Sequence, residues 1–107
     1  MQTFQMQLIQ VFLPLFDNQK QSFQRSLYDD IRKQLTDRFG GVTFYRHTPA
    51  EGLWKDESGK INYDELIIAE VMIVGFDKEW WQQFKQYLQQ AFRQEEILIR
   101  SIMFEKV

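Results

Sequence analysis

Two stripes of large apolar residues, each with members four positions apart, constrain the fold of this chain most strongly. A spacing of four keeps side chains on one face of an α-helix. Ser22 is positioned to cap the first helix, Gly40 and Gly41 end it, and Asp77 caps the second. The sequence therefore predicts two amphipathic helices, with the stripes Phe23, Leu27, Ile31, Leu35 and Phe39 in the first and Trp80, Phe84, Leu88 and Phe92 in the second.

Four segments with β-strand character surround these helices. They are rich in β-branched, aromatic or alternating apolar residues and cover residues 5–13, 42–48, 65–75 and 97–104. Residues 49–55 are expected to be irregular, and residues 56–60 are expected to form a turn. The order strand, helix, strand, strand, helix, strand predicts an α+β fold, the ferredoxin-like β-α-β-β-α-β sandwich. Both helices then cover one face of a four-stranded antiparallel sheet, the first and third strands are central, and residues 1–107 form one domain.

Composition excludes several classes of function. The chain has 107 residues, no cysteine and a net charge of −2. Disulfides and cysteine-based zinc sites therefore cannot form, and no basic surface for nucleic acid is expected. The first residues carry no basic leader, and no apolar run approaches the roughly 20 residues of a membrane span. We expect a cytoplasmic protein with neither nucleic-acid nor membrane partners.

The third strand decides which side chains face the helices. Its alternation turns Glu70 away from them, because the helix side takes Ile67, Ala69, Val71 and Ile73. The same phase in the first and last strands turns Gln10 and Arg100 to this second face, which is otherwise apolar. Together these three residues predict a polar row across the sheet. The phase of the second strand stays open, so it adds either Arg46 or the set Thr43, Tyr45 and His47.

An apolar sheet face left in water invites association. A second copy of the chain, or residues 51–60 folded over the face, must cover it, and a covered Glu70 must be protonated or paired with Arg46 or Arg100. One hypothesis is a homodimer that binds a small anionic molecule there, with arginine holding the anion and Glu70 or His47 moving a proton. The predicted ligand-binding residues are Gln10, Arg46, His47, Glu51, Trp54, Glu70 and Arg100.

The alternative hypothesis is a non-catalytic interaction or assembly module, in which the polar row is a structural ion pair at a dimer interface. RNA binding on the sheet fits less well, because the central strands carry mostly aliphatic residues rather than exposed aromatics. His47 is the only histidine, and together with Glu51 from the same loop it makes a weak metal site. We therefore expect no metal and no cofactor, and the sequence assigns no catalytic residue.

Three short strings, FGGVT at 39–43, AEGLWK at 50–55 and EVM at 70–72, resemble a family of small bacterial proteins with a ferredoxin-like fold and no characterised function. The resemblance implies that fold and a bacterial source. It implies no activity and no catalytic residues for this chain.

Overall fold

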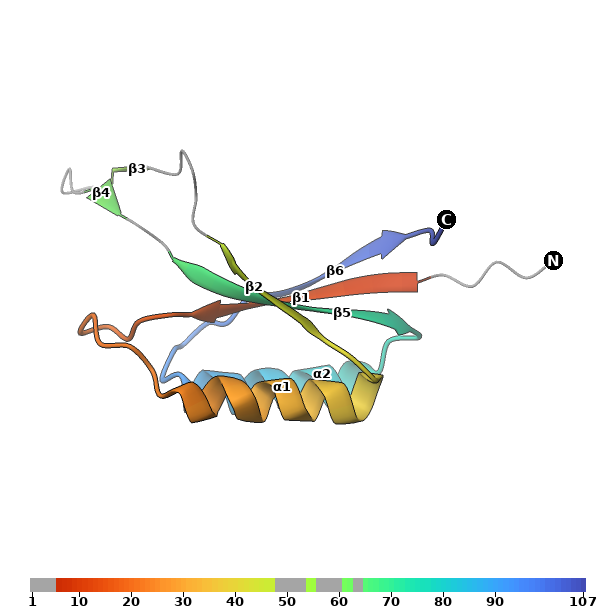
Figure 1. Ribbon diagram of the computed structural model, residues 1–107, viewed down its shortest axis with the longest axis horizontal. Coiled ribbons are helices and arrows are strands. Elements are labelled where there is room, and N and C mark those ends of the chain that lie inside the picture. The colour runs from red at the N-terminus through yellow and green to blue at the C-terminus, as the bar shows by residue number, and fades with distance from the viewer. Residues whose placement is uncertain (1–5, 48–53, 56–60, 63–64) are drawn as a thin grey trace.

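The computed structural model describes residues 6–47, 54–55, 61–62 and 65–107, and its main body is a sheet laid on two helices (Figure 1). The elements are β1 (Met6–Pro14), α1 (Arg25–Phe39), β2 (Thr43–His47), β3 (Trp54–Lys55), β4 (Ile61–Asn62), β5 (Leu66–Val74), α2 (Lys78–Ala91) and β6 (Ile99–Phe104). The main sheet has the order β2-β5-β1-β6, and all its neighbours are antiparallel. The predicted ferredoxin-like α+β fold is confirmed.

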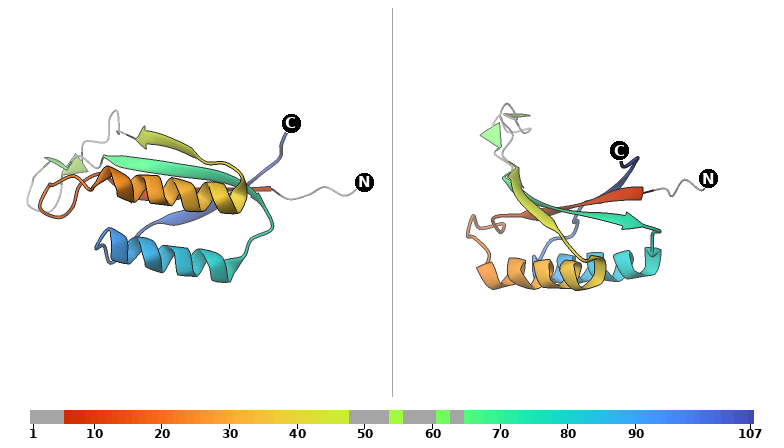
Figure 2. Two further views of the ribbon diagram at one scale, coloured as in Figure 1. Left: turned by 60° about the horizontal axis from the view of Figure 1, so that its bottom comes forward. Right: turned by 45° about the vertical axis from the view of Figure 1, so that its right-hand side comes forward.

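The core lies between the sheet and the helices. Both helices run side by side under one face of the sheet, and no described helix covers the other face (Figure 2). The predicted pleat is confirmed, because the helix-facing residues of the two central strands are buried. The buried core residues are Ile9, Val11 and Leu13 of β1, Ala69, Val71 and Ile73 of β5, Ile31, Leu35, Trp81, Phe84 and Leu88 of the helices, and Phe92 and Ile97 after α2.

The first helix begins later than predicted. Ser22 lies in an isolated β-bridge, and the residue at the N-cap position is Gln24, whose side chain makes no capping hydrogen bond. Asp17 explains the difference, because its Oδ1 accepts hydrogen bonds from the backbone N–H groups of Gln19 and Gln21 at 2.8 and 2.9 Å. This turn keeps Ser22 extended, so the prediction of Ser22 as the N-cap is wrong.

The other predicted helix ends are confirmed. Gly40 has φ 86°, and its N–H donates to the Thr36 carbonyl at 2.8 Å, which ends α1 in the left-handed conformation that glycine adopts without a Cβ clash. The Asp77 carboxylate accepts from the Trp80 N–H at 3.1 Å and caps α2. Asp77 also pairs with Arg38 at 3.0 Å, so the same side chain links the end of α1 to the start of α2.

Aromatic rings join the two helices. Phe39 of α1 stacks on Trp81 of α2 with ring centroids 5.2 Å apart and meets Trp80 edge-on at 5.1 Å. Trp80 in turn stacks on Phe84 at 5.0 Å. Such pairs add roughly 0.5–1.5 kcal/mol each beyond the area that they bury, so this cluster fixes how the helices sit against each other.

A second, two-stranded sheet was not predicted. In this sheet β3 and β4 pair antiparallel, with Trp54 opposite Asn62 and Lys55 opposite Ile61. Two-residue strands are too short to give a period-two pattern in the sequence, which is why this segment was predicted to be irregular. The turn predicted at 56–60 lies outside the described residues.

Arg93 occupies a position that helices usually give to glycine. It follows α2 with φ 52°, and its N–H donates to the Gln90 carbonyl at 3.2 Å. We expect Arg93→Gly to raise the free energy of unfolding by about 0.5–1 kcal/mol, because glycine lacks the Cβ that makes this conformation costly. Urea unfolding measures the change. The control Arg93→Ala loses the same guanidinium but keeps the Cβ, and a glycine variant no more stable than this control would contradict the prediction.

Candidate functional site

A row of polar residues crosses the sheet at the level of Glu70. Thr43 of β2 is opposite Glu70 of β5, Glu70 is opposite Gln10 of β1, and Gln10 is opposite Arg100 of β6. Directly opposed residues of antiparallel strands point to the same face. The structure therefore brings Gln10, Glu70 and Arg100 together on the face away from the helices, which we call the open face. Their role in ligand binding stays a prediction.

Side chains of the row form a continuous hydrogen-bonded chain. The Arg100 Nε donates to Gln10 Oε1 at 2.6 Å, and Gln10 Nε2 donates to Glu70 Oε2 at 2.6 Å. The Tyr45 hydroxyl donates to the same Glu70 oxygen at 3.1 Å. Arg100 was predicted as a direct partner of Glu70, but β1 lies between their strands, so the Gln10 amide bridges the two charges. Gln10 is 8% exposed, and both ends of its amide are satisfied.

Arg100 is held in place from two sides. Its guanidinium carbon lies 5.0 Å from the centre of the Phe12 ring, and its Nε bonds to Gln10. Among the described residues, its two terminal nitrogens have no hydrogen-bond partner, and the side chain is exposed. A guanidinium fixed in this way is ready to bind a carboxylate or phosphate through those two nitrogens.

Tyr45 joins the row, as one of the two alternatives for the second strand allowed, although it was not among the predicted ligand-binding residues. It is opposite Ile68 and therefore diagonal to Glu70, within reach of a long aromatic side chain. Burial, followed by the hydrogen bond and the negative charge of Glu70, raises the pKa of Tyr45, while Gln10 and Arg100 act in the opposite direction. The phase of β2 was the missing signal, because Phe44 and Tyr45 fit the core equally well by type.

Arg46 does not belong to this row. It is opposite Ile67, a helix-side residue, and it lines a groove beside α1. The bond between Tyr45 and Glu70 fixes the phase of β2, and alternation then turns Arg46 to the other face. Of the two alternatives left open for the second strand, the one with Tyr45 on the open face is correct, and Arg46 does not pair with Glu70 there.

The remaining predicted residues lie in the segment that follows β2. His47 ends β2 in register with Leu66, and Trp54 lies in β3 in register with Asn62. Glu51 is outside the described residues. Their predicted contributions to ligand binding stay predictions.

Apolar residues surround the polar row on the open face. Ile68 is 4% exposed between its opposite partners Phe12 and Tyr45. Farther from this centre the apolar side chains are open to solvent, with Met72 exposed to 59%, Val74 to 61%, Leu98 to 51% and Ile102 to 43%. The open face thus combines a satisfied polar row with apolar surface that nothing in the described chain covers.

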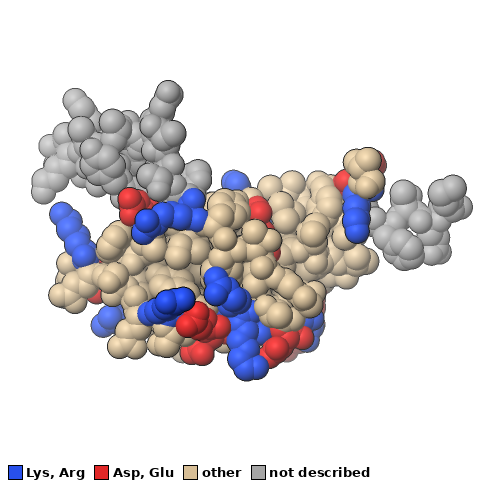
Figure 3. All heavy atoms as spheres, in the orientation of Figure 1, with Lys and Arg blue, Asp and Glu red and all other residues tan. Residues whose placement is uncertain are grey.

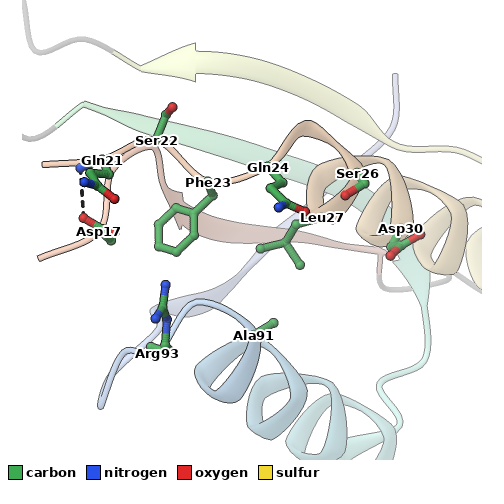
Figure 4. Close-up of a pocket in the computed structure, with 10 residues that line it drawn as sticks. All are labelled: Asp17, Gln21, Ser22, Phe23, Gln24, Ser26, Leu27, Asp30, Ala91 and Arg93. Atoms are coloured by element: carbon green, nitrogen blue, oxygen red, sulfur yellow. Dashed lines mark hydrogen bonds between the residues drawn. The ribbon is translucent and has the colours of Figure 1, made fainter. Parts of the chain in front are cut away.

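A separate hollow of about 500 Å³ lies between the loop before α1 and the end of α2 (Figure 4). Phe23 and Arg93 point into it, and Asp17 sits at its rim, bonded to the backbone of Gln21. The Asp17 carboxylate thus serves the turn of its own loop. This hollow lies in the helical layer, away from the polar row.

In the described ranges, no helix is long and apolar enough to cross a membrane. No group of three or more histidine or acidic side chains is arranged to hold a metal ion within these same ranges.

No protein-family model matches the sequence, and no curated protein matches it. Solved structures do share its fold. A phage SAM lyase in complex with S-methyl-5'-thioadenosine has 14% identity and a TM-score of 0.59, over 99% of this chain and 93% of that chain. CutA from Pyrococcus horikoshii has 14% identity and a TM-score of 0.53, over 94% and 86%. A Bacillus cereus protein related to NIF3 has 16% identity and a TM-score of 0.57, over 99% and only 27% of that longer chain.

At these identities the likeness shows the fold alone, a small α+β sandwich. The fold implied by the FGGVT, AEGLWK and EVM strings is confirmed to that extent. The activities named for the similar structures do not transfer by fold.

The polar row makes a prediction about charge. We expect Gln10→Glu to lower the free energy of unfolding by about 2 kcal/mol at pH 7. Two carboxylates would then lie within hydrogen-bonding distance of each other, and the pKa of one of them would rise. The loss should shrink toward pH 4.5, where that carboxyl takes up a proton. Urea unfolding at both pH values measures this.

Two variants control this experiment. Gln10→Met removes the amide without adding charge, so its effect should not depend on pH in this range. The double variant Gln10→Glu/Glu70→Gln exchanges the amide and the carboxylate, and it should recover most of the lost stability. A pH-independent loss in Gln10→Glu, or no recovery in the double variant, would contradict the described row.

Proposed function

We propose that this chain is a small-ligand-binding protein that self-associates through the open face of its sheet. In this proposal, the row of Arg100, Gln10, Glu70 and Tyr45 supplies polar contacts for the ligand. One observation carries the proposal: exposed apolar side chains surround a hydrogen-bonded row of charged and polar groups on one face.

The extent of the open face supports a second copy as its cover. Its central strands have nine residues each, and four strands lie side by side. At about 3.3 Å per residue and 4.8 Å between strands, such a face measures roughly 30 by 20 Å. Specific interfaces use about 800 Å² of accessible surface per partner, and a side-chain-covered face of this extent is of that order.

The charges of the row also favour a second copy. The Glu70 carboxylate lies toward β2, and the Arg100 guanidinium lies on β6 at the opposite edge. A two-fold axis parallel to the strands places β6 of one copy over β2 of its partner, at the roughly 10 Å spacing of packed sheets. The arginine of each copy then faces the acidic end of the other row, so the two faces are complementary in charge.

The ligand is inferred from the groups that the row leaves available. Arg100 offers its terminal nitrogens to an anionic group, and the carboxylate of Glu70 and the hydroxyl of Tyr45 lie two strands away, roughly 10 Å across the sheet. A small molecule with a carboxylate or phosphate at one end fits this arrangement. Because a similar fold holds S-methyl-5'-thioadenosine in the phage SAM lyase, that nucleoside belongs in the ligand panel.

The second candidate function is a non-catalytic assembly module. Its support is that Gln10 bonds to both charged neighbours without any ligand, so the row can serve as a purely structural element of the interface. We also propose that the protein comes from a bacterium, belongs to the family that the sequence strings resemble, and is located in the cytoplasm.

Self-association is tested by the mass in solution. We expect the wild-type protein to have the mass of two or more chains by light scattering at 10–100 μM, a range chosen for the test. Met72→Lys should shift this mass toward one chain, because it puts a charge into the apolar interface. Gln86→Lys on the exposed side of α2 adds the same charge and should leave the mass unchanged. A wild-type protein that is monomeric over this whole concentration range would overturn the proposed self-association.

Ligand binding is tested by thermal shift against small carboxylates, phosphates and S-methyl-5'-thioadenosine. A ligand well above its Kd should raise the Tm by about 4 °C or more. Arg100→Ala should abolish the shift. Arg46→Ala removes an equal charge from the opposite face and should retain it. No shift with any compound would favour the assembly module, and a shift lost equally in both variants would place the ligand elsewhere.

A further inference from the structure

A second distinctive surface lies at the β2 edge, where the sheet meets α1. A groove of about 280 Å³ runs there, with walls from α1 and β2 and with Ile67 of β5 as part of its lining. Figure 1 and both views in Figure 2 show β2 as the outer strand above α1. The groove opens beside α1, and Tyr45 is the one residue that it shares with the polar row.

The groove concentrates positive charge in a chain that is negative overall. Arg25, Arg32 and Arg46 line it, and Asp29 is the one acidic residue in its lining. The chain as a whole has a net charge of −2. Blue lysine and arginine side chains are visible on this face both on α1 and above it, near β2 (Figure 3). An acidic partner would therefore meet a local field opposite in sign to that of the whole chain.

Arg32 is oriented rather than loosely extended. Its guanidinium carbon lies 4.6 Å from the centre of the Phe44 ring, and its contact with Asp29, at 3.8 Å and exposed, is a weak one. The stacking leaves the guanidinium edge available to a carboxylate. The groove thus has an apolar floor from Phe44 and Ile67 under a cationic rim.

The backbone of β2 adds a second kind of contact. Among the described strands, β2 ends the sheet order, and its inner side pairs with β5. The outward half of its N–H and C=O groups therefore has no strand partner in the described chain. A peptide in extended conformation can add to such an edge as one more strand and place alternate side chains in an adjacent groove.

We propose that this groove binds an extended acidic peptide segment of a partner protein, which adds to the edge of β2. The peptide backbone pairs with β2, and its inward glutamate or aspartate side chains bind the groove arginines. Five residues of β2 provide room for a pairing of about the same length. A compact polyanion would use the same arginines but not the strand edge, and the experiment below separates the two.

The test uses a fluorescein-labelled heptapeptide of alternating glutamate and valine, with fluorescence anisotropy as the readout. We expect saturable binding at 50 mM NaCl that weakens at least tenfold at 300 mM, because the arginines carry the contact. The same peptide with N-methyl groups on the amides of one edge cannot pair with a strand on that edge. It should bind at least tenfold more weakly, as should a peptide with glutamine in place of glutamate.

Matched protein variants complete the design. Arg46→Glu and Arg32→Glu should each weaken peptide binding at least tenfold, whereas Lys78→Glu makes the same charge change at the start of α2 and should have little effect. Circular dichroism melting of each variant confirms that it is folded. The solution mass of Arg46→Glu should equal that of the wild type, so this result is independent of the open-face interface.

Three results would overturn the proposal. The first is equal binding of the N-methylated and unmodified peptides, which would exclude pairing with the strand edge. The second is equal weakening by Lys78→Glu and Arg46→Glu, which would reduce the effect to net charge. The third is binding of inorganic tripolyphosphate through these arginines without any binding of the peptide, which would assign the groove to a compact polyanion.

Discussion

The pleat of β5 is the constraint on which the rest of this molecule depends. A strand in the middle of a sheet must send successive side chains to opposite faces. Ala69, Val71 and Ile73 are buried under the helices, so Glu70 has to emerge on the other side. Hydrogen bonding between β5, β1 and β6 then carries the same phase across the sheet. The helical core and the polar row are two results of one alternation.

Much of the fold could be predicted from residue types because the signals were local and repeated. The four-residue stripes predicted the two helices, and glycine and aspartate predicted two of their four ends. Ser22 failed as a cap because a competing local contact, the Asp17 turn, had already fixed the chain before it. Local signals predict well until two of them compete for the same few residues.

The site was less predictable, because its parts come from four strands. Alternation within β1, β5 and β6 placed Gln10, Glu70 and Arg100 on one face. It could not show that Gln10 would stand between the two charges and bridge them, which depends on strand order and register together. The short edge strand β2 was the weakest case: both of its faces carry large residues, so neither Arg46 nor Tyr45 could be assigned before the cross-strand contacts were known.

The two bonds made by Gln10 have a consequence for observing the protein. A primary amide can usually turn by 180° and present either atom, but here its oxygen must meet a donor on Arg100 and its nitrogen must meet an acceptor on Glu70. The turned form would set donor against donor and oxygen against oxygen. The side-chain NH₂ of Gln10 is therefore an intrinsic spectroscopic reporter, because its nitrogen and proton resonances in a ¹⁵N-labelled sample respond to a change of charge or contact at either neighbour.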